Sequence, residues 1–494
     1  MDGEQFWIIL ILDGGIFLTK NNKLGAATMY KGKFEVFESI IREIMVVYKH
    51  DERPWLIGYS GGKDSTLLVS LVYEAIKRLK TAESKLTKKI YVITSDTMVE
   101  NPIVKKYMHS SSDSINRAAD KDHDDLPIEA YIIYPEPEQT FWSRIIGLGY
   151  PTPEPPGFRW CTDRLKIMPM NKFVNDRIKE SGQIVILLGV RKGESATRLK
   201  TITAREIEGK LLNMHNDIPN AYVYNPITEV PNDLVWEFLL KDDCKSPWGT
   251  DMKYLFNLYQ GESMGEEQSV LGEVDRDKIP VTGNSRFGCW CCTMVKEDKS
   301  LQSFINKSSG DDVKILTALR DFRNWLLEVR ESREYRDNKR RNGAVYKKSD
   351  GSFGLGPFTL EARRMILRKL LVLENETGLE LITESELKVI DKMWDEEGDL
   401  YCRNLVNIYY EIKNRKLPWD EYKVPRFDEE SIVEIENIAT KYNLPFELIT
   451  KLIVSVDSNK NITRNNKMQK AFDQIIGQGW LHYDAVEGVL ENEN

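Results

Sequence analysis

A short apolar run that leads directly into a polar, glycine-containing loop constrains the fold of this chain more than any other feature. Residues 55–60 read WLIGYS, residues 60–65 read SGGKDS, and residues 66–80 continue with helical spacing. Apolar side chains at positions 67, 68, 71, 72, 75, 76 and 79 fall on one helical face. A buried strand, a tight polar turn and an amphipathic helix in immediate succession indicate an α/β fold.

The loop has the chemistry of an anion site. Gly61 and Gly62 can adopt positive φ and let backbone N–H groups approach phosphate oxygens closely. The hydroxyls of Ser60 and Ser65 can donate to phosphate, and Lys63 adds a point charge. The following helix directs the positive end of its dipole into the loop. We therefore expect these residues to bind the phosphates of a nucleotide.

Asp64 leaves two interpretations open, since it either helps to hold Mg²⁺ or caps the helix. For the whole loop, the simpler alternative is a Gly-Gly turn before a capped helix. Six matching residues between a buried strand and an amphipathic helix favour the phosphate site. The Walker pattern GxxxxGK[ST] is missing. SGGKDS instead resembles the PP-loop of enzymes that split ATP between its α and β phosphates.

Further apolar runs of strand length predict a parallel sheet. They occupy residues 89–96, 129–135 and 184–190 and alternate with helical stretches. This alternation over residues 50–240 predicts a doubly wound, mostly parallel α/β sheet. Ligands of such sheets bind beyond the carboxyl ends of the strands, so we expect Ser60, Asp96 and Val190 to converge on one crevice.

Composition narrows the class of protein. A net charge of −8 and a pI of about 5.5 argue against a protein that coats nucleic acid by bulk electrostatics. One basic run, Arg330–Lys348, contains Tyr335 and Tyr346 and is either a DNA-contacting stretch or a solvated helix face. The apolar run Phe6–Leu12 lacks a basic start and is shorter than a membrane helix. We expect it to form a short strand, and we expect a cytoplasmic protein.

Seven sequence blocks follow one another along the chain. In order they read RPWLIGYSGGKDST, SDTMVENPIV, FWSRIIGLGYPTP, FRWCTDRLKI, LLGVRKGESATR, VWEFLL and GNSRFGCWCCTMVKEDKS. Together they resemble the DndC-type proteins of DNA phosphorothioation, including the related SspD branch, within the phosphoadenylylsulfate reductase-like PP-loop superfamily. The resemblance implies replacement of a non-bridging DNA phosphate oxygen by sulfur. ATP with Mg²⁺ would activate the phosphate by adenylylation, pyrophosphate would leave, and a cysteine desulfurase partner would supply sulfur as persulfide. It also implies DNA binding together with other phosphorothioation proteins.

The resemblance and the chain's pattern together predict four segments. We expect an N-terminal lead-in segment at 1–50 and a PP-loop ATP pyrophosphatase domain at 51–260. An irregular cysteine-containing segment at 261–310 and a largely helical region at 311–494 would follow.

By the same resemblance, Ser60–Ser65 would hold the pyrophosphate portion of ATP, with Lys63 and Asp64 in the catalytic set. Asp96 and Glu100 match a block that makes them candidates for metal or ribose contact. Arg191 resembles the superfamily arginine near the phosphate, where a guanidinium would stabilise charge that develops during attack at the α-phosphorus.

Cys161 is a candidate catalytic thiol. Arg159, Arg164 and Lys166 flank it in the sequence, and such a setting lowers a thiol pKa and favours thiolate. These cations would also form an electropositive channel for an anionic substrate, and we include Arg159 among the nucleotide-binding residues. The alternatives are a buried structural cysteine and solvated surface charges.

Cys289 and Cys292 form a CxxC pair in the FGCWCCT block and are candidate metal ligands. DndC-type proteins typically carry an iron–sulfur cluster here with two further cysteines upstream, but the corresponding positions fall near Val270 and Thr282. Because a 4Fe–4S cluster needs four thiolates, this departure leaves a cluster, a persulfide-accepting site, a weak metal site and a structural relic all open. Cys244 and Cys402 are expected to be structural.

Two other classes of function remain open. One is a PP-loop enzyme that adenylylates a different acceptor, as in tRNA thiolation or sulfate activation. The other is a degenerate PP-loop scaffold that gathers desulfurase and DNA-binding partners. Sulfate-reductase activity is not expected, because the chain ends VEGVLENEN without a reductase cysteine motif.

Overall fold

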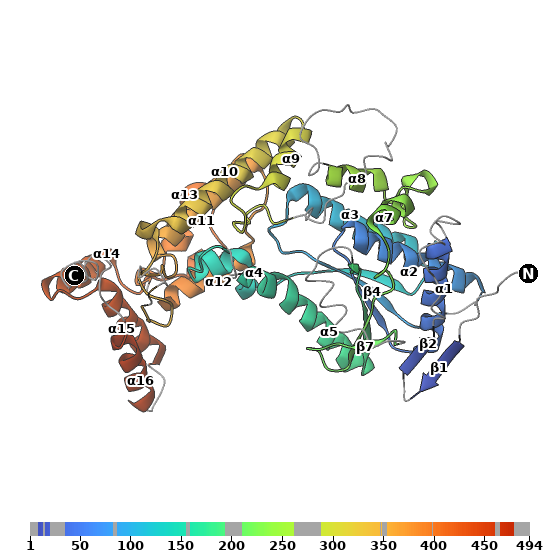
Figure 1. Cartoon of the computed structure of the whole chain (residues 1–494). Helices are drawn as coiled ribbons and strands as arrows, with labels where there is room; N and C mark the ends of the chain where they lie inside the picture. The colour runs from blue at the N-terminus through green and yellow to red at the C-terminus, as the bar shows by residue number, and fades with distance from the viewer. Residues whose placement is uncertain are drawn as a thin grey trace, which may run out of the picture. The chain divides into compact units, whose positions relative to one another are not determined.

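A computed structural model describes residues 8–12, 15–19, 35–82, 86–154, 159–192, 210–260, 288–345, 347, 353–397, 399–459 and 465–478. The chain divides into two compact units (Figure 1). Unit 1 comprises residues 1–134, 165–289 and 299–307, and unit 2 comprises residues 135–164, 290–298 and 308–494.

Unit 1 is built around a six-stranded sheet with the order β5-β4-β3-β6-β8-β7. All neighbouring strands are parallel except β7, which pairs antiparallel with β8. The strands are β3 (Trp55–Gly58), β4 (Ile90–Ser95), β5 (Ile128–Ile133), β6 (Ile184–Leu187), β7 (Asn213–Met214) and β8 (Ala221–Tyr224). The predicted mostly parallel sheet is confirmed. The short strands β7 and β8 were not predicted.

Helices cover both faces of this sheet, as the doubly wound prediction requires. Trp55 and Ile57 of β3 belong to one core cluster, whereas Leu56 between them belongs to another. This alternation follows from the two-residue period of a strand. One cluster contains residues of α1 (Glu35–His50), α2 (Lys63–Ala82), α3 (Pro102–Ala119), α7 (Asn232–Leu239) and α8 (Met252–Gln260). The other contains Val174 of α5 (Met168–Ser181), on the side of the sheet opposite α2 and α3 (Figure 1).

The helix α1 is part of this core rather than a lead-in, because Ile41, Ile44 and Val47 are fully or almost fully buried in it. Lys88 closes the end of α1. Its Nζ donates to the backbone oxygen of Tyr48 at 2.7 Å and to that of Asp51. The same Nζ lies 4.1 Å from the ring centroid of Tyr48 and 4.6 Å from that of Trp55. Residues before α1 form a separate antiparallel pair, β1 (Ile8–Leu12) and β2 (Gly15–Thr19), which confirms the short N-terminal strand.

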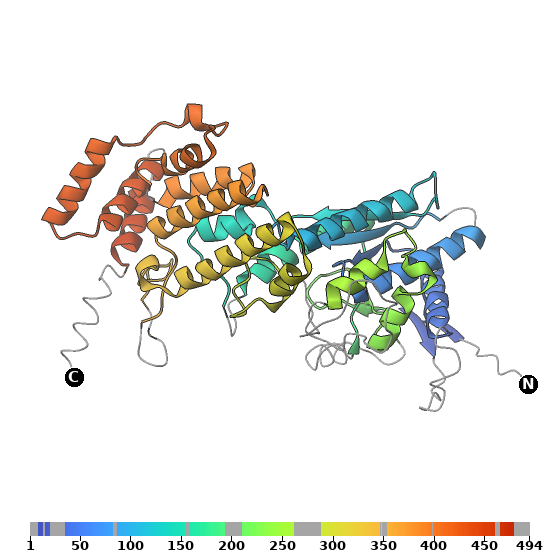
Figure 2. The ribbon, with the colours of Figure 1, turned by 90° about the horizontal axis from the view of Figure 1, so that it is seen from above.

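Unit 2 is helical, which confirms the expectation for the C-terminal region. Its long helices are α10 (Asp311–Glu331), α11 (Leu360–Thr377), α12 (Glu384–Glu397), α13 (Asn404–Lys413), α14 (Glu429–Lys441), α15 (Phe446–Asn459) and α16 (Asn465–Ile476). In Figure 2, α10 and α11 run side by side. Within the described part of the chain, every helix is too short or too polar to span a bilayer.

Two segments that we expected elsewhere belong to unit 2. The first, residues 135–164, contains the π-helical turn η3 (Ser143–Gly147) and the short helix α4 (Trp160–Thr162). Its Trp142 Nε1 donates to the backbone oxygen of Leu381 at 2.8 Å, and Trp394 Nε1 donates to that of Ile146 at 2.7 Å. The second segment, residues 290–298, places Trp290 beside Trp142, with 5.9 Å between ring centroids.

Candidate functional site

The polar loop lies between β3 and α2 in unit 1, where the sequence predicts it. Gly61 has a φ of +71°, a conformation that side-chain-bearing residues rarely adopt. Gly62 matters for a different reason, because a Cβ there would lie 2.9 Å from the hydroxyl of Tyr259, which would have to shift. Helix α2 begins at Lys63, so its N-terminal amides face the loop.

Hydroxyl groups hold the loop in shape. Ser65 Oγ donates to the backbone oxygen of Gly62 at 2.9 Å and lies 3.2 Å from Ser60 Oγ. The backbone N–H of Lys63 donates to the hydroxyl of Tyr259 at 3.1 Å, and Lys63 Nζ lies 5.7 Å from the centroid of that ring. Tyr259 lies in α8, far along the chain, and no motif in the sequence marks it as part of this site.

A cluster of three charges lies at the N-terminal end of α2. Lys63 Nζ is 2.8 Å from Asp64 Oδ2, and Arg191 Nε is 2.6 Å from Asp64 Oδ1. Arg191 is further fixed by bonds to the backbone oxygen of Val230 at 3.1 Å and to Asn232 Oδ1 at 3.2 Å. The side chain of Arg191 is 3% exposed. The structure thus brings together three of the predicted catalytic residues, and Asp64 links the two cations.

Asp96 follows β4 at the carboxyl edge of the sheet, as expected. It is fully buried and accepts a hydrogen bond from the backbone N–H of Met98 at 2.7 Å. His109 of α3 places its Nε2 2.9 Å from Asp96 Oδ2, and Lys105 Nζ lies 3.6 Å from the same oxygen. No motif in the sequence marks His109 as a partner of Asp96, because the five histidines form no ligand spacing.

Glu100 has a separate set of partners. Its Oε1 accepts from Thr97 Oγ1 at 3.0 Å and lies 3.4 Å from Lys166 Nζ. Cys289 forms a backbone bridge with Glu100, and its Sγ lies 3.5 Å from Thr97 Oγ1. Lys166 therefore pairs with Glu100 in unit 1. Arg164, which we placed with Lys166 in one channel, belongs to unit 2 and donates to Gln139 Oε1 at 2.7 Å.

Cys161 differs from its expectation. Burial raises the pKa of the Cys161 thiol, and the neighbouring Cys292 raises it further, so the predicted thiolate is wrong for this structure. Arg159 is exposed, and burial likewise raises the pKa of Cys292 despite the nearby positive charges of Arg323 and Arg159. A flanking arginine lowers a thiol pKa only when its charge outweighs the desolvation of the thiolate.

The cysteines do not assemble a described metal site. Cys289 belongs to unit 1, whereas Cys292 belongs to unit 2. Among the residues that the structure describes, no three His, Cys, Asp or Glu side chains are grouped to hold a metal ion. Positions 270 and 282 lie outside the described residues, as does the stretch 193–200 after Arg191. The described thiols therefore do not fit a four-thiolate cluster.

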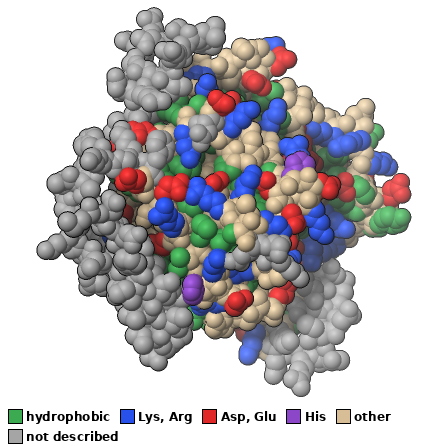
Figure 3. Space-filling view, turned by 90° about the vertical axis from the view of Figure 1, so that its right-hand side faces the viewer, with side chains coloured by type: hydrophobic (Ala, Val, Ile, Leu, Met, Phe, Trp, Pro, Cys, Tyr) green, Lys and Arg blue, Asp and Glu red, His purple; other side chains and the backbone are tan. Residues whose placement is uncertain are grey.

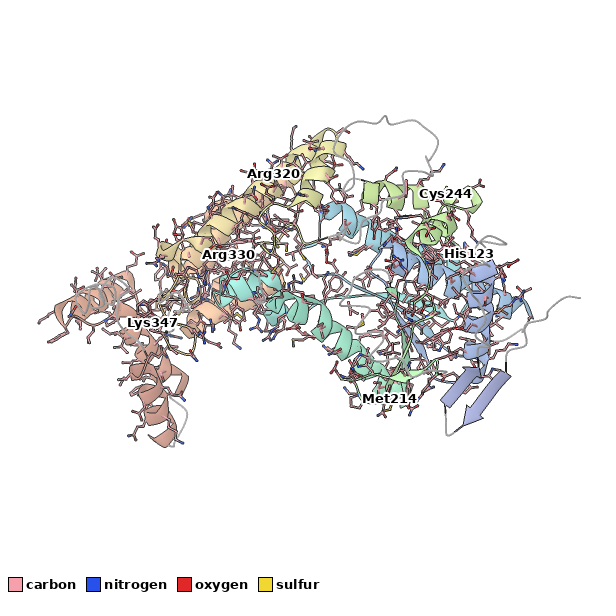
Figure 4. The ribbon with its side chains drawn as sticks, viewed as in Figure 1. His123, Met214, Cys244, Arg320, Arg330 and Lys347 are labelled. Atoms are coloured by element: carbon pink, nitrogen blue, oxygen red, sulfur yellow. The ribbon has the colours of Figure 1, made fainter. Side chains whose placement is uncertain are left out.

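The two remaining cysteines are buried, as their structural interpretation requires. The thiol of Cys244, which is labelled in Figure 4, donates to the backbone oxygen of Leu240 at 3.1 Å. The thiol of Cys402 donates to the backbone oxygen of Asp399 at 2.9 Å.

Much of the basic run at 330–348 is used inside unit 2. Arg330, labelled in Figure 4, is buried and donates to the backbone oxygens of Pro153 at 2.8 Å and Thr293 at 3.2 Å. Lys339 is also buried and lies 3.1 Å from Glu447. Tyr346 lies outside the described residues. On the face shown in Figure 3, the Lys and Arg side chains of the described residues are interspersed with Asp and Glu side chains.

Comparisons with known proteins agree with the sheet and its loop. Residues 54–295 match the family described as the phosphoadenosine phosphosulfate reductase domain. An uncharacterised protein of Methanocaldococcus jannaschii is 23% identical over 252 residues, which cover 47% of this chain. The match spans 43% of that relative's own length.

Similar solved structures include the phosphoadenylyl-sulfate reductase of Candida auris in a phosphate complex. It is 13% identical, covers 50% of this chain and 98% of its own, and has a TM-score of 0.28. The U34-tRNA thiolase NcsA of Methanococcus maripaludis, with its 4Fe–4S cluster, is 16% identical and covers 45% of this chain and 73% of its own, with a TM-score of 0.25.

Proposed function

From a phosphoadenosine phosphosulfate reductase-like domain of the PP-loop superfamily at residues 54–295, we propose that this chain is the ATP pyrophosphatase and sulfurtransferase component of a DNA phosphorothioate modification system. Its role is to activate a backbone phosphate of DNA by adenylylation, with release of pyrophosphate, for replacement of a non-bridging oxygen by sulfur. The reaction would take place in the cytoplasm.

The observation that carries the proposal is the charge cluster at the N-terminal end of α2. Lys63 and Arg191 share the single carboxylate of Asp64, at 2.8 and 2.6 Å, so the cluster keeps one net positive charge. The helix dipole and the loop amides add positive potential at the same place. Because the three side chains are almost entirely buried, their field acts on a bound phosphate with little screening by water.

These groups suit cleavage between the α and β phosphates. A non-bridging oxygen of the DNA phosphate attacks the α-phosphorus of ATP, and the bond from that phosphorus to the bridging oxygen breaks. The electron pair of the broken bond leaves with pyrophosphate, where Lys63 and Arg191 would stabilise the growing negative charge. Asp64 is the loop carboxylate that would contact Mg²⁺, which neutralises phosphate charge when it is bound. In the described part of the chain, no cluster of metal-ligating side chains surrounds Asp64. The phosphates of ATP would therefore supply most of the Mg²⁺ ligands that Asp64 does not.

The DNA acceptor is supported by the sequence blocks that extend from residue 53 to residue 300 in the order of DndC-type proteins. Sulfur would come from a cysteine desulfurase as persulfide, and other phosphorothioation proteins would present the DNA. Cys289 is the described cysteine of unit 1 at the carboxyl edge of the sheet, beside Thr97 and Glu100.

Pyrophosphate release from ATP tests the proposal directly. Purified protein with Mg²⁺ and DNA is expected to release pyrophosphate, and Lys63→Ala should slow the release by about 100-fold or more, since removal of one transition-state donor typically has this effect. Lys77→Ala is a matched control, because Lys77 lies on the same helix with a 49% exposed side chain and pairs with Asp124. The control should release pyrophosphate at the wild-type rate.

The same assay separates the alternatives. If the wild-type protein releases no pyrophosphate with any of the acceptors, the enzymatic proposal fails and the scaffold alternative stands. Release that responds to tRNA or sulfate but not to DNA would identify a different acceptor. In cells, DNA sulfur content that persists in the Lys63→Ala strain would contradict a role for this loop in phosphorothioation.

A further inference from the structure

Two arginines of unit 2 lie beside the ring of Tyr150, and a third, Arg164, is linked to one of them. The guanidinium carbon of Arg144 lies 5.5 Å from the centroid of the tyrosine ring, and that of Arg341 lies 6.0 Å from it. Arg164 is tied to Arg144 through Gln139. The Nη1 of Arg164 donates to Gln139 Oε1 at 2.7 Å, and Nη2 of Arg144 donates to the same oxygen. Residues from η3, from the end of the 135–164 segment and from the chain after α10 thus meet at one point.

At Arg144, no described carboxylate offsets the positive charge. Glu397 lies 2.6 Å from Arg341 and 2.7 Å from Arg363, so one carboxylate already serves two guanidinium groups. Arg144 is only 8% exposed, yet among the described residues it has no ion-pair partner, and its Nε is buried without an acceptor. Burial, with the positive charges of Arg164 and Arg341, lowers the pKa of Arg144.

An uncompensated buried guanidinium is costly, because the protein replaces its hydration only in part. The amide oxygen of Gln139 accepts hydrogen bonds from two arginines but brings no negative charge to them. Arginine presents planar sets of N–H donors that match the oxygens of a phosphate group. An external phosphate at this cluster would supply both the missing charge and the missing acceptors.

We propose that Arg144, Arg164 and Arg341 form a second phosphate-binding site, in unit 2, that holds one backbone phosphate of a nucleic-acid strand. The site is reachable from solvent, since the side chain of Arg341 is 40% exposed and Arg164 is half-buried. The need for an anion at these arginines is independent of the proposed function, but the identification of that anion as nucleic acid rests on the proposed function. The site would hold the strand at a contact separate from the phosphate loop, which lies in unit 1.

The test measures binding of a fluorescent single-stranded DNA oligonucleotide, and of its duplex, to the full chain by anisotropy at several salt concentrations. Arg341→Gln should weaken binding by about tenfold and lower the slope of log affinity against log salt by about 1. Gln139→Glu provides a second variant that does not remove an arginine. It places a carboxylate between Arg144 and Arg164, so it should weaken binding to a similar degree while it raises the thermal midpoint.

Arg320→Gln is the matched control. Arg320 lies on α10 of unit 2, is labelled in Figure 4, and pairs with Asp321 at 2.8 Å, so its loss removes the same charge away from the cluster. Affinity and salt slope should stay at wild-type values in this variant. If Arg341→Gln and Gln139→Glu bind the oligonucleotide as the control does, the second site is wrong.

Inorganic phosphate distinguishes a free anion from a strand. It should displace the oligonucleotide only at concentrations far above the affinity of the strand. Equal affinity for inorganic phosphate and for the oligonucleotide, both lost in Arg341→Gln, would overturn the assignment to nucleic acid. A wild-type chain that binds DNA through this cluster but releases no pyrophosphate would contradict the proposed function and leave the second site in place. Pyrophosphate release combined with unchanged DNA binding in both variants would overturn the second site and leave the proposed function in place.

Discussion

The buried side chain of Lys88 makes the stability of this protein depend on pH over a defined pH range. Its ammonium lies beside the rings of Tyr48 and Trp55 and donates to two backbone oxygens at the end of α1. Burial lowers the pKa of Lys88 to about 7, although Asp51 and Glu52 oppose the shift. In the unfolded chain the same group has its ordinary pKa of 10.5.

This difference predicts a pH-dependent stability. Between about pH 7 and pH 10.5 the unfolded chain binds the proton of Lys88 and the folded chain releases it, so the free energy of unfolding rises with pH through this window. Below about pH 7 both states bind the proton, and the contribution of Lys88 to stability is at its least favourable. Urea unfolding of the wild type and of Lys88→Met at several pH values measures the effect.

The difference between the two proteins isolates Lys88 from other groups that titrate. The wild type should gain stability relative to Lys88→Met as the pH rises from 7 towards 10. A stability difference that stays constant over this range would show that the lysine keeps its proton, with the two backbone oxygens outweighing the burial.

At this scale the sequence predicted the residues of the site better than their partners. The loop from Ser60 to Ser65 followed from a local motif, and the place of Arg191 as a cation near it followed from the family resemblance. Tyr259 contacts the loop from 196 positions along the chain, and nothing in the sequence around it signals that contact. The prediction of a thiolate at Cys161 is wrong, because flanking charges can be read from a sequence whereas the burial that raises the thiol pKa cannot.

Among the elements, α10 holds the cysteine segment of unit 2 in place. Its Arg323 is fully buried and donates to the backbone oxygens of Cys292 at 2.8 Å, of Lys296 at 2.9 Å and of Val295. Three carbonyl groups of one irregular segment therefore take their hydrogen bonds from a single side chain. The conformation of residues 290–298 depends on this helix more than on its own backbone pairing.

Arg323→Met should release that segment. We expect a loss of about 1–3 kcal/mol of unfolding free energy, since three partly buried hydrogen bonds lose their donor and water can reach some of the freed acceptors. The thiol of Cys292 should also react faster with iodoacetamide, which mass spectrometry of the alkylated peptide measures. Arg323→Lys, which keeps donors and charge, should recover part of the stability. An alkylation rate unchanged in Arg323→Met would contradict the role of α10.

The sequence also predicted elements in proportion to their length and periodicity. β3, β4, β5 and β6 followed from continuous apolar runs, and the C-terminal helices followed from helical spacing. β7 has two residues and β8 has four, and the pattern of so short a strand is not distinguishable from that of a loop. Their place at the sheet edge is set by pairing with β6 and with each other, which local sequence does not encode.

For the whole molecule, the chain order of the two units is the feature that matters most. Unit 2 is made of three stretches, residues 135–164, 290–298 and 308–494. The first stretch provides Phe141, Trp142, Ile145 and Ile146, all of them buried. A boundary placed at residue 310 by composition therefore cuts through a packed core, because sequence pattern reports where helices are and not which distant segment completes them.

A fragment of residues 308–494 should consequently fail to fold as the intact unit does. Without the 135–164 segment, Leu381 loses the Trp142 hydrogen bond and Trp394 loses its acceptor at Ile146. We expect the fragment to lack a cooperative urea transition and near-ultraviolet circular dichroism, both of which the full chain should show. A sharp transition in the fragment would mean that the helices after residue 308 form a self-sufficient core.

The interleaved order also governs how the protein emerges from the ribosome. The aromatic stretch at 135–164 is synthesised early, but its partner Trp394 follows roughly 230 residues later, which at about 5–20 residues per second takes roughly 10–50 s. During that interval, the later helices of unit 2 are not yet available for Phe141 and Trp142 to pack against. A nascent chain with such an exposed apolar stretch is a substrate for ribosome-associated chaperones. In a host that lacks these chaperones, the amount of folded protein should fall, while the activity of each folded molecule should stay the same.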